Sequence, residues 1–394
     1  MTAVIRENAT VTPLELFFDL VFVLALTQCT ALMAEQPTWE GLTKGLLVLG
    51  VLWWSWVGYA WLTSLVDPEE GAVRIVIFAA MAALLVAALC VPTVFGDSGL
   101  LFALAYGAVR IAHIALFMVG ARGDPGLRQS VIGLGVSTGI GVLLLGAAAF
   151  ADGTLQGALW AVAIVLDMGG PYVFGAEGWK LMPAHFAERH GLIVIIALGE
   201  SIVAIGAGVE GAVGAGVVAS AVLGVAVAAG LWWLYFDIVA LVAERRLAGA
   251  PPGRERNELA RDAFSYLHLP MVAGIVLVAL GMKKTVGHPE DALKLVPAVA
   301  LFGGTACYLF AHVVFRWRMI HRLNRHRLAA GVLLLALVPL AVEVPSLAAL
   351  GLLAAVLTAL LAVETRRFAE LRDRLRHETP LAENRTGEPA GSPP

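Results

Sequence analysis

Charge is scarce in this sequence: Lys, Arg, Asp and Glu make up 14% of its 394 residues, against about 25% in a soluble domain. Apolar residues make up 59%, against about 45–50% in a soluble domain. This composition excludes an ordinary soluble fold and predicts a membrane protein in contact with the lipid bilayer. The charges lie mostly between the apolar runs rather than on a folded basic face, so no nucleic-acid partner is expected.

Cysteine is equally scarce, with three residues, Cys29, Cys90 and Cys307, all in apolar segments. Their positions suggest neither a disulfide framework nor a metal site. The HExxH and Walker A patterns are missing too, and these carry common zinc and nucleotide chemistries. We therefore expect no metal and no cofactor, and we assign no catalytic residue.

Long apolar runs dominate the sequence. They predict an all-α polytopic membrane protein with about twelve transmembrane helices, because a span needs about 20 apolar residues. The predicted spans are 13–34, 42–64, 72–94, 99–120, 128–150, 154–174, 190–209, 212–243, 259–282, 292–315, 328–343 and 346–363.

The basic residues predict the orientation of these spans. With twelve spans, 22 of the 27 Lys and Arg residues fall on the side of the two termini, four fall on the other side, and Arg110 lies inside a span. Loops rich in Lys and Arg stay in the cytoplasm. Both termini are therefore expected in the cytoplasm.

Two pairs of matching motifs indicate an internal repeat. Trp53-Trp54-x-Trp56 resembles Trp232-Trp233-x-Tyr235, and Ala112-His113 resembles Ala311-His312. Six spans per half would relate two parallel repeats by an axis along the membrane normal. The expected divisions are a cytoplasmic N-terminus (1–12), two six-helix halves (13–180 and 181–363), and a cytoplasmic tail (364–394), helical and then disordered.

Two carboxylates lie in the first span, Pro13–Ala34. Thr12 and Glu15 form the pattern of a capping box with Pro13 at the first helical position, so Glu15 has a structural role available. Asp19 lies one turn further along the same face. No local rule requires it there, and ionisable groups inside a span are costly, so Asp19 is a candidate for ion or substrate binding.

Arg110 and Glu200 are the charges predicted nearest the membrane midplane. If the seventh span starts at His190, Glu200 lies roughly 15 Å inside the membrane. We expect these two residues to pair, either as a structural ion pair or as a proton-dependent switch that also involves His113 or His268. The alternative for His268 is a purely structural role, as a hydrogen-bonded histidine within the helix bundle.

Two further carboxylates have structural and functional interpretations. Asp167 precedes Gly169-Gly170-Pro171, which indicates either a broken helix at a binding site or a plain helix end. Asp237 is expected at the cytoplasmic interface, an ordinary place for a carboxylate.

Three motifs resemble the bacterial low temperature requirement protein A family: LELFFDLVFV at 14–23, HFAERHGL at 185–192 followed by LGES at 198–201, and LWWLYFD at 231–237. They span most of residues 12–240, and the second half of the chain matches only in hydropathy. The resemblance implies a bacterial multi-spanning inner-membrane protein and does not imply a particular reaction.

Four functions remain open at this point. The first is a secondary transporter of a small solute or ion, which twelve spans, a parallel repeat and buried carboxylates favour, and which could be coupled to protons. The others are an ion channel lined by Asp19, a membrane-embedded enzyme using His113, His268 and Glu200, and a structural or stress-related membrane protein. The oligomeric state is left open.

Overall fold

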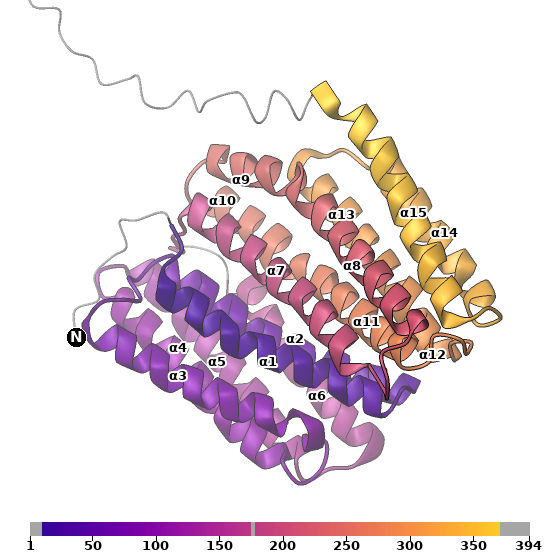
Figure 1. Cartoon of the computed structure of the whole chain (residues 1–394). Helices are drawn as coiled ribbons and strands as arrows, with labels where there is room; N and C mark the ends of the chain where they lie inside the picture. The colour runs from indigo at the N-terminus through magenta and orange to yellow at the C-terminus, as the bar shows by residue number, and fades with distance from the viewer. Residues whose placement is uncertain (1–9, 175–177, 371–394) are drawn as a thin grey trace, which may run out of the picture.

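Helix α1 (Pro13–Glu35) begins as its sequence predicts, with a capping box at Thr12 and Glu15 and with Pro13 in the first turn. The Thr12 side chain accepts from the Glu15 amide, and the Glu15 carboxylate accepts from the Thr12 amide at 2.8 Å. The computed structural model describes residues 10–174 and 178–370, which form a bundle of helices (Figure 1).

Five further long helices follow α1 in the first part of the chain, with a 3₁₀ turn (Val91–Thr93) after the third helix. They are α2 (Trp39–Thr63), α3 (Gly71–Cys90), α4 (Gly99–Gly120), α5 (Pro125–Ala148) and α6 (Gly153–Val173).

The second part of the chain has more broken helices. They are α7 (Pro183–Ala207), α8 (Ala215–Phe236), α9 (Val239–Gly249), α10 (Arg254–Leu259), α11 (His268–Gly287), α12 (Leu295–Ala298), α13 (Gly304–Ile320), α14 (Arg325–Ala341) and α15 (Ser346–Arg367). Two π-helical segments, Ala260–Tyr266 and Val299–Gly303, join α10 to α11 and α12 to α13.

Within each of the two parts, the helices pack against one another in the same order. In the first, α1 packs on α2 and α3, α3 on α4, α4 on α5, α5 on α6, and α6 returns to α2. In the second, α7 packs on α8 and α11, α11 on α13, α13 on α14, α14 on α15, and α15 returns to α8. The parts meet where α1 contacts α7 and α11, along the middle of the bundle in Figure 1.

The expected all-α, multi-pass architecture is confirmed. Ten helical segments of the described residues are long and apolar enough to cross a bilayer. Helices α6 and α14 coincide with the predicted spans 154–174 and 328–343 but are not among the ten, and α14 has 17 residues. The number twelve therefore stays a prediction.

One predicted span boundary is wrong. The seventh predicted span starts at Pro183 instead of His190, because charged residues that look like a loop are buried in ion pairs inside α7. The predicted span 212–243 overlaps the single candidate segment Ala215–Gly249, whose helix is interrupted between Phe236, where α8 ends, and Val239, where α9 begins.

Arg189 and Arg327 fall just outside the predicted spans 190–209 and 328–343 and so count there as loop residues. In the structure they lie inside α7 and α14 and are 1% and 6% exposed. Without these two arginines, fewer Lys and Arg residues lie on the side of the two termini, but that side still carries more of them than the opposite side. Most of the expected N-terminus 1–12 and most of the expected tail 364–394 lie outside the described residues.

Candidate functional site

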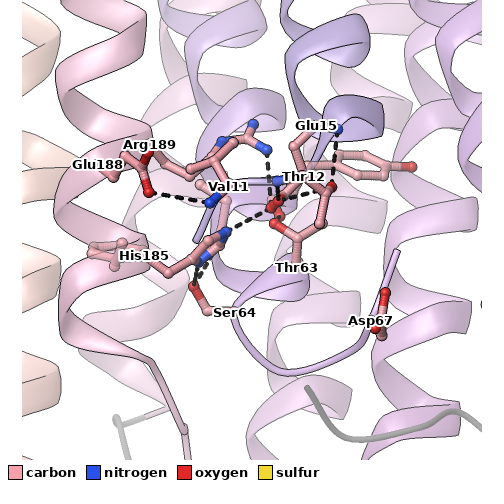
Figure 2. A network of polar contacts seen from close by, with 12 residues as sticks. Val11, Thr12, Glu15, Thr63, Ser64, Asp67, His185, Glu188 and Arg189 are labelled. Carbon is pink, nitrogen blue, oxygen red and sulfur yellow. Dashed lines mark hydrogen bonds and ion pairs between the residues drawn. The ribbon is translucent and has the colours of Figure 1, made fainter. Parts of the chain in front are cut away.

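Glu15 is the centre of a buried ionic network between α1, α2 and α7 (Figure 2). Its Oε1 lies 2.7 Å from Nε2 of His185 and 3.2 Å from Nη1 of Arg189. The other ring nitrogen of His185 lies 3.0 Å from the Ser64 hydroxyl. Glu15 therefore both caps α1 and ties α1 to α7, and the capping interpretation describes only part of its role.

Asp19 joins the same network one turn further along α1. Its Oδ1 accepts from Nη2 of Arg189 at 2.7 Å and from the Trp56 indole at 2.9 Å. Its Oδ2 is buried and has no hydrogen-bond partner among the described residues. Asp19 thus has the structural contacts that the sequence did not reveal, and it keeps one oxygen open to a proton or a ligand.

Arg189 bridges the two carboxylates from the opposite helix. The fork of its guanidinium contacts Glu15 and Asp19, and its carbon Cζ lies 5.6 Å from the ring centre of Trp56. With His185 protonated, two anions would face two cations, which is the balance that buried charges require. Sequence reasoning missed His185 and Arg189 as site residues, although their spacing of four residues places them on one helix face.

A line of aromatic and imidazole rings leads from this network into the second part of the bundle. His190 lies 5.0 Å from Trp56 and 5.1 Å from His268, measured between ring centres. His268 Nε2 lies 2.8 Å from the Tyr235 hydroxyl, and its Nδ1 lies 3.1 Å from the Ala263 carbonyl. These contacts match the structural role of His268, a hydrogen-bonded histidine within the helix bundle.

Arg110 pairs with Asp167, and the predicted pairing with Glu200 is wrong. Nη2 of Arg110 lies 3.0 Å from Oδ1 of Asp167 and donates to the Thr138 hydroxyl at 2.7 Å. The Tyr106 hydroxyl donates to the other Asp167 oxygen at 2.9 Å. This cluster lies between α4, α5 and α6 and is buried.

Glu200 accepts a hydrogen bond from the Thr27 hydroxyl of α1 and is 1% exposed. The expected pairing assumed that the seventh span starts at His190, but α7 starts seven residues earlier. At about 1.5 Å per residue, Glu200 lies roughly 25 Å from the start of its helix, well past the middle. Arg110 is near the middle of α4.

His113 lies one turn from Arg110 and is 1% exposed. Gly58 makes room for it, since a Cβ at Gly58 would lie 2.8 Å from the His113 Cε1. Both Arg110 and His113 line a small cavity of about 40 Å³ beside Trp54 and Trp61. Among the described residues, neither His113 nor His268 contacts Glu200, whose side chain binds Thr27.

The expected helix break after Asp167 is absent, since α6 continues through Gly169-Gly170-Pro171 and ends at Val173. The alternative, a plain helix end, is the one observed. Asp237 lies at the junction of α8 and α9 and lines a cavity of about 280 Å³. No group of three or more His, Cys, Asp or Glu side chains in the described part of the chain could hold a metal ion.

Ten apolar helical segments with charged clusters buried between them define a multi-pass α-helical membrane protein. The chain belongs to the family described as bacterial low temperature requirement A protein (LtrA), whose model matches residues 10–362.

One relative, named “Uncharacterized protein RA0937”, comes from Rhizobium meliloti (strain 1021). It is 32% identical over 311 residues, which cover 75% of this chain and 74% of the relative. No solved structure matches.

Proposed function

We propose that the protein is a secondary transporter of a small solute or ion, coupled to protons through Asp19. The observation that carries this proposal is the buried Oδ2 of Asp19, which has no partner in the described residues while Oδ1 binds Arg189 and Trp56. Ionisable side chains at such positions in membrane proteins commonly serve ion pathways and proton relays.

The geometry supports a simple coupling step. A proton on Oδ2 would neutralise Asp19 and weaken its bond to Arg189, whose guanidinium would then be held by Glu15 alone. Because Arg189 belongs to α7 and both carboxylates belong to α1, this exchange would change the contact between the two parts of the bundle.

The order of helix contacts supports two parallel repeats of the predicted kind, 13–180 and 181–363. Parallel halves related by an axis along the membrane normal, with a substrate site between them, are a common transporter architecture. The α1–α7 contact lies between the proposed halves.

The proposed location is the bacterial inner membrane, with both termini in the cytoplasm, because the arginine-rich loops lie on the side of the termini. Reporter fusions after Gln36 and after Arg122 test the orientation. Alkaline phosphatase should be active at the first site, and a green fluorescent protein should be bright at the second. The reverse pattern would overturn the orientation.

Asp19→Asn tests the transport proposal. Purified protein is placed in vesicles that contain the pH-sensitive dye pyranine, and ions and small metabolites are added outside in turn. We expect at least one of them to drive proton movement in the wild type. We expect Asp19→Asn to abolish this movement while it folds with a similar yield. An amide can accept from Trp56 and Arg189 but cannot titrate, and Arg189 keeps Glu15 as its counter-charge.

Glu40→Gln is the matched control, because Glu40 is a carboxylate whose side chain is 70% exposed. It should transport like the wild type. Equal proton movement in Asp19→Asn and wild type would contradict the coupling role of Asp19. Currents far above the turnover rate of a carrier would show that the protein is an ion channel instead of a transporter.

A further inference from the structure

A second cavity, separate from the Asp19 network, lies among α8, α9, α13, α14 and α15. Its volume is about 280 Å³. Its walls are largely apolar and include Leu234, Val242, Phe315, Met319, Leu361 and Phe368. Trp233 lines it as well and is 44% exposed on the outside of α8, where lipid contacts a spanning helix. The cavity therefore borders the lipid-facing surface of the bundle.

Positive charge gathers in this cavity. Arg316, Arg322 and Arg327 line it, and Asp237 and Glu364 are the acidic side chains there. Arg327 is balanced by Glu364, with nitrogen–oxygen distances of 2.9 and 2.8 Å. The two remaining arginines, Arg316 and Arg322, outnumber the one remaining carboxylate, Asp237, so the lining keeps a net positive charge.

His312 supplies an independent sign of a ligand. Its Nδ1 lies 2.8 Å from Nη1 of Arg327. A guanidinium can only donate, so Nδ1 accepts and the neutral ring carries its proton on Nε2. That nitrogen is buried without a partner among the described residues, on a side chain that is 1% exposed. A buried donor without an acceptor is costly, and an oxygen atom in the cavity would satisfy it.

We propose that this cavity binds an anionic phospholipid. Phosphate oxygens would accept from His312 Nε2 and contact Arg316 and Arg322, while an acyl chain would pack along Trp233 and Leu361. Basic pockets between spanning helices recognise anionic headgroups in this way. The apolar walls and the border at Trp233 favour a lipid over free phosphate, because free phosphate would leave this apolar surface uncovered.

Thermal unfolding of the purified protein in a neutral detergent tests the proposal. The additives are dioleoylphosphatidylglycerol, dioleoylphosphatidylcholine and inorganic phosphate, each titrated separately. A ligand that binds the folded state raises the unfolding temperature. We expect a saturable rise with dioleoylphosphatidylglycerol alone, and we expect native mass spectrometry to detect one such lipid retained per chain.

The double variant Arg316→Gln/Arg322→Gln should lose both the rise and the retained lipid, whereas Arg128→Gln, at an exposed arginine far along the chain from this cavity, should keep them. If the double variant does not fold, Arg322→Gln alone, at an exposed position, should weaken the apparent lipid affinity several-fold. An equal rise with dioleoylphosphatidylcholine or with inorganic phosphate, or an unchanged response in the variants, would overturn the proposal.

Discussion

Replacing Arg189 with Met should leave most of the protein unfolded or aggregated after extraction from the membrane. Glu15 and Asp19 are each 1% exposed and both contact this guanidinium. Removing one partner of a buried ion pair typically costs about 3–5 kcal/mol, because the other charge stays buried without compensation. Since a domain is stable by only about 5–15 kcal/mol, this loss is large.

The measurement is size-exclusion chromatography of a fluorescent fusion, followed by thermal unfolding of the monodisperse fraction. Arg189→Lys should be intermediate, because one ammonium cannot reproduce two separate guanidinium contacts. Arg128→Gln, at an exposed arginine, should change stability by no more than about 0.5 kcal/mol.

Adding Glu15→Gln and Asp19→Asn to Arg189→Met should recover part of the folded yield, since the triple variant buries no unpaired charge at this site. Recovery would assign the defect to the carboxylates rather than to the lost packing of the arginine stem. If Arg189→Met alone folds as well as the wild type, the network is not a determinant of stability.

Local sequence rules predicted the parts of this site that depend on neighbours in the chain. The capping box at Thr12 and Glu15 is such a feature, because its hydrogen bonds join residues three apart. The position of Asp19 one turn deeper on the same helix also follows from helix geometry alone.

Partners from distant helices were not predictable in the same way. Hydropathy treats His185 and Arg189 as loop residues, since it scores each side chain as if it were unpaired. The structure buries both against α1, so α7 starts earlier and Glu200 lies further along this helix than predicted. Arg110 and Asp167 were both selected as candidates, but their contact depends on how α4 packs beside α6, and the sequence does not encode that arrangement in any local pattern.

A double-mutant cycle on Arg110 and Asp167 should show a large interaction energy between the two side chains in the free energy of unfolding. Asp167→Asn removes the counter-charge of a guanidinium that is 1% exposed, so it should cost about 3–5 kcal/mol. Arg110→Met in the same chain should then cost little or restore stability, because a buried pair replaced by neutral groups is often close to neutral. Thermal unfolding of wild type, both single variants and the double variant measures the interaction.

The matched cycle replaces Asp167→Asn with Glu200→Gln. Glu200 binds Thr27 of α1 and does not contact Arg110 in the described part of the chain, so its effect should add to that of Arg110→Met within about 0.5 kcal/mol. Additivity in the Asp167 cycle combined with strong coupling in the Glu200 cycle would contradict the observed pairing.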